Sequence, residues 1–216
     1  MEYVNLKGAR VPALGLGTWQ LSGAQCADIV RAGLDLGYRH IDTAQAYNNE
    51  EEVGVALAGS GVARDDIFLT TKVWYERIAP GELQRSVDES LTKLRTDHVD
   101  LLLIHWPNAK VPLGDSLKAL AEVKAQGKAR HIGVSNFTVA LLKEAVESHG
   151  ADLICDQVEY HPFLSQRPVL EFLRSHGMFL TAYSPIARGE AATHPTLVRI
   201  GEAHGKSAVQ VTLRWL

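Results

Sequence analysis

Short apolar runs alternate with amphipathic stretches along most of this 216-residue chain. Six runs are nearly continuous in apolar and β-branched residues: Tyr38–Thr43, Ile67–Val73, Val99–Trp106, His131–Asn136, Leu153–Tyr160 and Phe179–Ser184. Such runs are typical of parallel strands that are covered on both faces. Helical periodicity predicts helices over 24–36, 49–58, 81–95, 115–126, 138–148, 166–176 and 195–204. This alternation indicates repeated βα units and therefore an α/β fold with a parallel sheet.

Turn residues mark several element boundaries. Glycine follows four of the predicted helices, at Gly37, Gly127, Gly150 and Gly177, where a left-handed C-cap residue belongs. The segment Val4–Leu16 has Lys7-Gly8 in its middle and predicts a β-hairpin. The run Gly15-Leu-Gly17 lacks the third glycine of a dinucleotide-binding fingerprint, so we interpret it as a turn.

Length and composition favour one soluble globular domain over residues 1–216 that acts on a small molecule. The chain is 46% apolar and 22% charged, and its net charge of −3 gives no basic surface for nucleic acid or an anionic membrane. No stretch approaches the roughly 20 apolar residues that span a bilayer, and the start lacks signal-peptide character, so we expect a cytoplasmic protein. Cys26 and Cys155 have no CxxC or metal-ligand spacing, and we expect two reduced, buried thiols and no metal site.

Polar side chains recur where the predicted strands end, which is where parallel α/β folds place their reactive groups. They are Asp42 with Tyr47 in the following loop, Lys72, His105 with Trp106, Ser135 with Asn136, Gln157 with Tyr160, and Tyr183 with Ser184. Lys72 lies in an otherwise apolar run, and a buried lysine needs a partner, for which Asp42 is the natural choice. A lysine beside Tyr47 would lower the pKa of the tyrosine from about 10 and suit it to act as a general acid.

Each of these residues also has a purely structural interpretation. Asp42 and Lys72 could form a buried ion pair that only fixes packing, and His105 could be a satisfied core histidine. The aromatic rings of Trp19, Trp74 and Trp106 could pack in the core or wall an apolar pocket. The joint occurrence of Asp42, Lys72 and His105 at successive strand ends favours a catalytic set. Strand periodicity alone leaves open whether the sheet is doubly wound or part of a barrel.

Seven blocks in order along the chain resemble the aldo-keto reductase family. They are Leu14-Gly-Leu-Gly-Thr-Trp19, Tyr38-Arg-His-Ile-Asp-Thr-Ala44 with Tyr47, Thr71-Lys-Val73, Val99-Asp-Leu-Leu-Leu-Ile-His-Trp-Pro107, Ile132-Gly-Val-Ser-Asn-Phe137, Gln157-Val-Glu-Tyr-His-Pro162 and Ala182-Tyr-Ser-Pro185. The resemblance implies a (β/α)8 TIM barrel of aldo-keto reductase type, with about six of its eight strands in this chain. It also implies NADPH-dependent reduction of small aldehydes, ketones and α-dicarbonyls, such as methylglyoxal or 2,5-diketo-D-gluconate, by a monomer.

The resemblance assigns roles to individual residues. Tyr47 would protonate the carbonyl oxygen, Lys72 and Asp42 would tune it, and His105 would orient the substrate. The cofactor would be held by Thr18, Asp42, Ser135, Asn136, Gln157, Tyr183, Ser184 and Ile186. The substrate pocket would be lined by Trp19, Tyr47, Trp74, His105 and Trp106.

Two departures from the family pattern qualify this expectation. Family members continue past the position of residue 216 with the segment that binds the 2′-phosphate of NADPH. We therefore expect a C-terminally incomplete barrel. The residues that choose between NADPH and NADH would lie in that further segment. Asp156 stands where the family usually has asparagine. The alternative is therefore a non-catalytic nucleotide-binding protein or a truncated, inactive relative.

Overall fold

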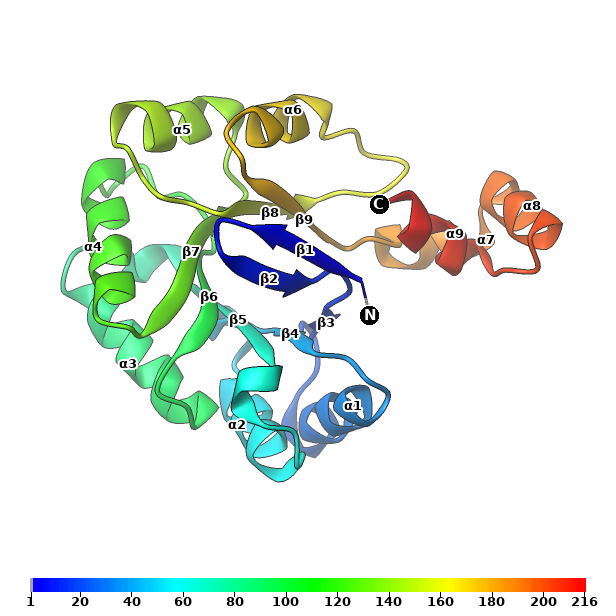
Figure 1. Ribbon diagram of the computed structural model, residues 1–216, viewed down its shortest axis with the longest axis horizontal. Coiled ribbons are helices and arrows are strands. Elements are labelled where there is room, and N and C mark those ends of the chain that lie inside the picture. The colour runs from blue at the N-terminus through cyan, green and yellow to red at the C-terminus, as the bar shows by residue number, and fades with distance from the viewer. Residues whose placement is uncertain (1) are drawn as a thin grey trace. The chain divides into compact units, whose positions relative to one another are not determined.

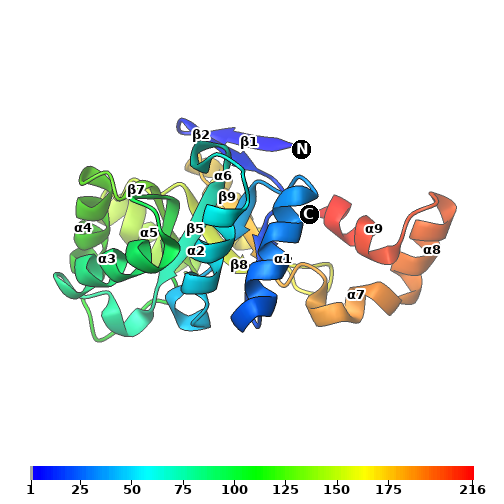
Figure 2. The same cartoon turned by 90° about the horizontal axis from the view of Figure 1, so that it is seen from below.

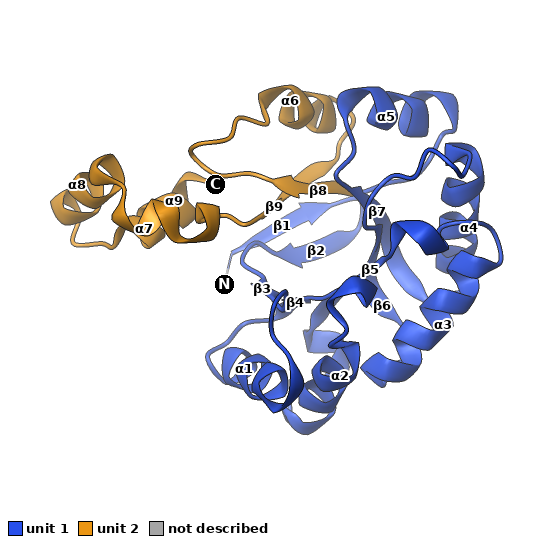
Figure 3. Ribbon diagram, turned by 180° about the vertical axis from the view of Figure 1, so that it is seen from behind, with its two compact units in different colours: residues 1–154 blue, residues 155–216 orange. Residues whose placement is uncertain are grey.

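The computed structural model describes residues 2–216. These residues divide into two compact units, one ending at Ile154 and the other beginning at Cys155 (Figure 3). Each unit contains parallel strands and helices of its own.

The first unit begins with the predicted hairpin. Strands β1 (Tyr3–Leu6) and β2 (Ala9–Pro12) pair antiparallel. The loop residues Lys7 and Gly8 have φ of 46° and 79°, the left-handed conformations that a two-residue type I′ hairpin loop requires. The hairpin ends at Pro12, earlier than expected. The carbonyl oxygen of Pro12 lies 3.3 Å from Nδ1 of His40, which belongs to the next sheet.

Five parallel strands follow in sequence order within the first unit. They are β3 (Leu16–Gly17), β4 (His40–Asp42), β5 (Phe68–Val73), β6 (Val99–Ile104) and β7 (Ala129–Ser135), as Figure 1 shows. All residues of β5 and β6 are buried, which explains their continuous apolar runs. Strand β3 corrects the interpretation of Gly15-Leu-Gly17 as a turn, because Leu16 and Gly17 pair with Ile41 and Asp42 of β4.

The helices of the first unit connect these strands and lie along the outer face of the sheet (Figures 1 and 2). They are α1 (Gly23–Asp35), α2 (Glu50–Gly59), α3 (Glu82–Leu94), α4 (Leu113–Ala125) and α5 (Val139–Lys143), with short 3₁₀ turns η1 (Gln45–Tyr47), η2 (Arg64–Asp66) and η3 (Tyr75–Arg77). The helix predicted over 138–148 continues from α5 as a π-helical segment, η4 (Glu144–Ser148). Thr138 caps α5, since its hydroxyl accepts from Leu141 N.

Helices α2 and α3 approach each other closely at one glycine. A Cβ atom added to Gly54 would lie 2.2 Å from the carbonyl oxygen of Lys93 and 2.9 Å from Leu94 Cα. These are backbone atoms, so the clash could not be relieved by a side-chain rotation. Gly54 therefore sets the distance between the helix that follows Tyr47 and the helix that precedes β6.

An ion-pair cluster around the buried Asp100 lies near the amino ends of the strands of the first unit. Asp100, the second residue of β6, is 4% exposed and accepts a 2.9 Å hydrogen bond from Leu69 N. Its carboxylate also contacts Arg64 at 2.9 Å and Arg130 at 3.1 Å. The cluster ties β5, β6 and β7 together at the end opposite the predicted catalytic residues.

The second unit contains a parallel strand pair and four helices. Strands β8 (Cys155–Glu159) and β9 (Phe179–Tyr183) pair in register from Cys155↔Phe179 to Glu159↔Tyr183. Helix α6 (Arg167–Ser175) connects them, and η5 (Ala187–Gly189), α7 (Glu190–Thr193), α8 (Pro195–Ala203) and α9 (Ala208–Trp215) follow. A small apolar core of Ala191, Leu197 and Ala208 joins the last three helices.

Residues 2–216 thus contain seven strands of the parallel series, five in the first unit and two in the second, where the sequence analysis expected six. Cys26 and Cys155 are both buried, as predicted. Among the described residues, no helix is both long and apolar enough to cross a bilayer.

Candidate active site

Lys72 is the centre of a polar cluster at the carboxyl ends of β4 and β5. Its side chain is fully buried, because β5 is buried along its whole length. The ammonium nitrogen donates to the carboxylate of Asp42, to Thr43 O at 3.0 Å and to the hydroxyl of Tyr47 at 3.3 Å. Asp42 ends β4, and Tyr47 ends the short η1 turn that follows it. The structure therefore brings together three of the four predicted catalytic residues.

The partners of Lys72 decide its charge. Burial alone would lower the pKa of this ammonium group, but the Asp42 carboxylate and the Tyr47 hydroxyl outweigh burial, and the net pKa is raised above its ordinary value. Lys72 is consequently a cation at neutral pH. The predicted Asp42–Lys72 pair is confirmed as a contact.

The pKa of Tyr47 departs from the expected direction. Burial of the phenol raises its pKa, the positive charge of Lys72 acts to lower it, and the Asp42 carboxylate raises it again, so that the net pKa lies above the ordinary value. Lys72 acts in the expected direction, but burial and the Asp42 carboxylate, which the expectation left out, outweigh it. The phenol is therefore protonated at neutral pH, as a proton donor must be.

His105 completes the cluster from the end of β6. Its ring centroid lies 5.6 Å from that of Tyr47 and 5.4 Å from that of Trp74, in edge-to-face arrangements. Burial, reinforced by the charge of Lys72, lowers the pKa of His105 to about 4. The imidazole is therefore neutral at physiological pH. Its buried Nδ1 has no hydrogen-bond partner within residues 2–216.

The residues predicted to bind the cofactor fall in both units. In the first unit, Asn136 adopts a φ of 63° just after β7 and donates to His105 O at 3.0 Å and to Ser135 Oγ at 3.1 Å. Thr18 is fully buried, and its backbone N–H donates to Asp42 O at 2.9 Å. Both contacts place these residues beside the Lys72 cluster.

The remaining predicted cofactor residues belong to the second unit, on β8, on β9 and in the segment that follows: Gln157, Tyr183, Ser184 and Ile186. Gln157 is 4% exposed. Ser184, Ala187 and Arg188 have φ near 50° although none of them is glycine. Such left-handed non-glycine residues store strain and cluster at ligand clamps and switch regions.

The predicted pocket tryptophans differ in their surroundings. Trp74 follows β5, is half-buried and contacts the rings of His105 and Tyr75. Trp19 is 50% exposed and Trp106 is 43% exposed. The structure therefore links Trp74 directly to the cluster and leaves the other two as surface aromatic rings in the first unit.

Sequence reasoning missed three polar residues that support the cluster: Gln45, Asn49 and Glu50. Asn49 is fully buried, donates to Thr18 O at 2.8 Å and to Leu21 O at 2.9 Å, and accepts from Thr43 Oγ1 at 2.9 Å. Glu50 is 2% exposed, and burial raises its pKa. The polar run Tyr47-Asn-Asn-Glu50 at the start of a predicted amphipathic helix was the available signal, but it is equally typical of a solvated helix N-terminus.

Comparison with known proteins identifies the family. A sequence profile of the Aldo/keto reductase family matches residues 13–216. The methylglyoxal reductase DkgB of Salmonella typhi is 44% identical over 208 residues, which cover 95% of this chain and 78% of that protein. The glyoxal reductase of Bacillus subtilis is 40% identical over 209 residues, which cover 96% of this chain and 75% of that protein.

Solved structures agree with the sequence relatives. A crystal structure named as a candidate 2,5-diketo-D-gluconic acid reductase B matches with a TM-score of 0.97 and 51% identity, over 100% of this chain and 77% of that one. The parallel βα series is thus that of the (β/α)8 barrel of these reductases, and relatives named as reductases favour an enzyme over a non-catalytic binding protein. The chain therefore belongs to the aldo/keto reductase family, whose members reduce carbonyl groups with a nicotinamide cofactor.

Proposed function

We propose that this enzyme reduces small aldehydes and α-dicarbonyls with NADPH, with Tyr47 as the proton donor. The observation that carries this proposal is the contact of a fully buried, cationic Lys72 with both the Asp42 carboxylate and the Tyr47 hydroxyl. A reduced nicotinamide supplies the hydride when it is bound. The protein must then supply orientation and a proton.

The proton goes from the Tyr47 hydroxyl to the carbonyl oxygen as negative charge develops there. Its loss leaves a phenolate, and the Lys72 ammonium 3.3 Å away stabilises that anion. Asp42 keeps Lys72 charged inside a buried strand. A raised tyrosine pKa before reaction and a cation beside the phenolate after it are both consistent with a general acid.

His105 orients the carbonyl group. A neutral imidazole carries one N–H, and a buried N–H without an acceptor is costly, so the proton is expected on Nε2 rather than on the unpaired Nδ1. The ring would then donate a hydrogen bond to the carbonyl oxygen without competing to transfer a proton. Trp74, packed on His105, forms an apolar wall beside it.

The residues at the strand ends fit a nicotinamide cofactor. Ser135 and Asn136 place a hydroxyl and a carboxamide next to His105, and these groups match the hydrogen-bonding needs of the nicotinamide carboxamide. In the second unit, Gln157 and Tyr183 offer a second amide and a ring on which the nicotinamide could stack. The strained backbone from Ser184 to Arg188 suits a segment that lies along a pyrophosphate.

The substrate class rests on the relatives. Proteins at 44% and 40% identity are named methylglyoxal reductase and glyoxal reductase, and we extend small α-dicarbonyls to this chain. We also propose that the protein is a cytoplasmic monomer. Analytical ultracentrifugation of the purified protein tests the monomeric state.

The test is steady-state reduction of methylglyoxal, followed as loss of reduced-nicotinamide absorbance, with NADPH and NADH compared at equal concentrations. Turnover with NADPH at a kcat/KM at least about tenfold above that with NADH supports the proposal. Turnover of a simple aldehyde but not of methylglyoxal would overturn the substrate class. Absence of any NADPH-dependent reduction would overturn the activity itself.

A further inference from the structure

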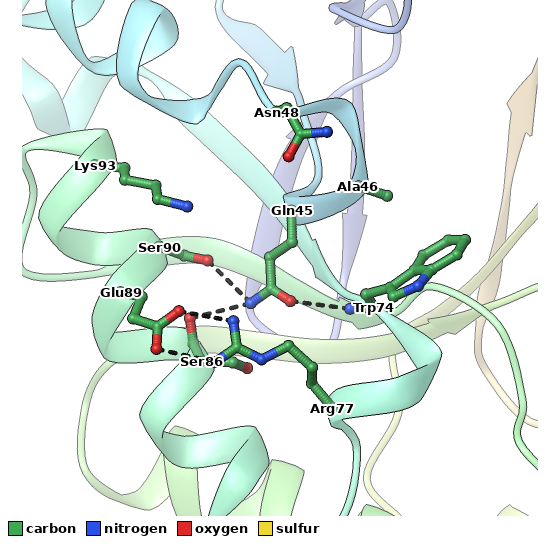
Figure 4. Close-up of a pocket in the computed structure, with 9 residues that line it drawn as sticks. All are labelled: Gln45, Ala46, Asn48, Trp74, Arg77, Ser86, Glu89, Ser90 and Lys93. Atoms are coloured by element: carbon green, nitrogen blue, oxygen red, sulfur yellow. Dashed lines mark hydrogen bonds and ion pairs between the residues drawn. The ribbon is translucent and has the colours of Figure 1, made fainter.

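Gln45 bridges three elements around the Lys72 cluster. It lies in η1, two residues before Tyr47, and its side chain points toward Ser86 and Ser90 of α3 (Figure 4). Its Oε1 atom accepts a 3.0 Å hydrogen bond from Trp74 N, at the end of β5. Its Nε2 atom donates to Ser86 O at 3.0 Å and to Ser90 Oγ at 3.1 Å, both on α3. The Gln45 carboxamide therefore connects the turn that ends at Tyr47 to Trp74, which packs on His105.

The contacts continue from Ser90 to the other side of Tyr47. The Ser90 hydroxyl donates to Glu50 Oε2 at 3.2 Å, and the Thr71 hydroxyl donates to Glu50 Oε1 at 2.6 Å. Glu50 begins α2, three residues after Tyr47, and Thr71 precedes Lys72 on β5. Both flanks of Tyr47 are thus joined to α3 and also, through Trp74 N and the Thr71 hydroxyl, to the strand that carries Lys72 or its end.

The backbone of η1 gives Tyr47 little support of its own. The turn has only three residues, and Asn48 ends it with a φ of 53°. Single 3₁₀ turns have few hydrogen bonds and depend on their surroundings. Side-chain contacts must therefore hold this turn in place.

The outer side of the turn faces an open surface pocket. The pocket has a volume of about 460 Å³ and is lined by Gln45, Ala46, Asn48 and Lys93 among others, as Figure 4 shows. Arg77, which also lines it, is held by two contacts with Glu89 at 2.7 and 2.9 Å and does not reach the turn. On this side of the turn, the hydrogen bonds of Gln45 to Trp74, Ser86 and Ser90 are the contacts that join η1 to its neighbours.

We infer that Gln45 is a positioning residue: it fixes the Tyr47 hydroxyl against Lys72 and fixes Trp74 against His105. The inference deepens the proposed function, on which it rests. A proton donor must be placed to within about an ångström of the reacting oxygen, and a misplacement of that size can cost about a hundredfold in rate. Gln45 touches neither Tyr47 Oη nor His105, so its effect on catalysis passes through the placement of these groups.

Gln45→Met tests the inference, because methionine has a similar length and shape but neither donates nor accepts strongly. We expect kcat for methylglyoxal to fall about tenfold while the KM for NADPH stays within about twofold. With deuterated NADPH, the isotope effect on kcat should rise, since proton and hydride transfer become slower than product release. A residue that only stabilised the fold would not change this isotope effect in protein that is fully folded.

Lys93→Met is the matched control. Lys93 lines the same pocket but makes none of the hydrogen bonds described here, and its substitution should leave kcat and the isotope effect unchanged. If Gln45→Met does not fold, Gln45→Glu replaces it, because glutamate keeps the acceptor for Trp74 N and removes the donor to Ser86 and Ser90. A folded variant at Gln45 that keeps the wild-type kcat and isotope effect would overturn the inference.

Amide hydrogen exchange separates this inference from the proposed function. In Gln45→Met, the Trp74 amide loses its acceptor, and exchange over residues 44–48 and 74 should accelerate relative to Lys93→Met. If the wild-type enzyme reduced no carbonyl, the proposed function would fail, and exchange would still decide whether Gln45 holds the turn. Unchanged exchange at both segments would refute the positioning role regardless of activity.

Discussion

The ammonium group of Lys72 donates to the hydroxyl of Tyr47 across 3.3 Å while it also contacts the carboxylate of Asp42. A tyrosine in this position meets two opposing influences. Burial keeps it protonated before the reaction, and Lys72 stabilises the anion that the reaction produces. In the proposed mechanism, the pair can therefore support proton donation although the pKa of the tyrosine is not lowered.

Removal of the Tyr47 hydroxyl should abolish most of the reduction. For Tyr47→Phe we expect kcat to fall by at least about a hundredfold, the lower range for the loss of a general acid, with the dissociation constant for NADPH nearly unchanged. Stopped-flow or steady-state reduction and fluorescence titration measure the two quantities. Tyr75→Phe is the control, because the Tyr75 hydroxyl contacts only Glu76 at the surface, at 3.4 Å. Wild-type turnover in Tyr47→Phe would remove this residue from the chemistry.

The Asp42–Lys72 pair should separate stability from activity. Lys72→Met leaves the Asp42 carboxylate, 16% exposed, without its cation, and should lower the free energy of unfolding by about 3 kcal/mol. Adding Asp42→Asn removes the unpaired charge and should restore part of that loss without restoring turnover. Denaturant titrations of both single variants and the double variant give the coupling. Strictly additive stability losses would contradict a direct interaction between the two side chains.

The neutral state of His105 predicts a specific pH dependence. Its pKa of about 4 in the folded protein lies below the value of about 6.5 expected for an unfolded chain, so the unfolded chain binds more protons between these values. The contribution of His105 to stability is therefore complete above about pH 6.5 and is lost as the pH falls toward 4. Wild-type protein should lose more stability than His105→Gln between pH 7 and pH 5, as measured by urea unfolding. Equal losses in both proteins would show that His105 titrates normally.

The approach of α2 to α3 predicts opposite effects for two glycines of the same helix. Gly54→Ala would place a methyl group 2.2 Å from Lys93 O and should destabilise the protein by roughly 1–3 kcal/mol. At Gly59 an added Cβ meets nothing within 4 Å, and alanine there should stabilise by up to about 1 kcal/mol. Thermal unfolding of the two variants provides the comparison. A neutral Gly54→Ala would mean that the helices can separate without cost.

The central strands were predictable because they are buried along their whole length. Strands β5 and β6 appear in the sequence as unbroken apolar runs, and no local pattern competes with them. Strand β3 was missed because two residues, Leu16 and Gly17, are too few to show a period. Their strand character comes from backbone pairing with Ile41 and Asp42, which are distant in sequence.

The proximity of Asp42, Tyr47, Lys72 and His105 was predictable from the sequence, whereas their electrostatics and the polar residues that support them were not. Lys72 stood out as a charge in an apolar strand, which implies a partner. The pKa of Tyr47 depends on the balance of burial, Lys72 and Asp42, and that balance needs distances. Gln45 was unpredictable for a related reason, since a glutamine in a loop looks the same in sequence whether it faces water or joins three elements.

The ion cluster of Asp100, Arg64 and Arg130 gives the first unit a second electrostatic centre at the opposite ends of the strands that carry Lys72 and His105. Substitutions around Asp100 would act at the amino ends of the strands, away from the cluster of Asp42, Tyr47 and Lys72. Conversely, substitutions in the loops around Tyr47 and Trp74 could admit a different carbonyl compound while Asp100 still joins the strands at their amino ends. Substitutions could therefore change the stability of the protein and its substrate specificity independently of each other.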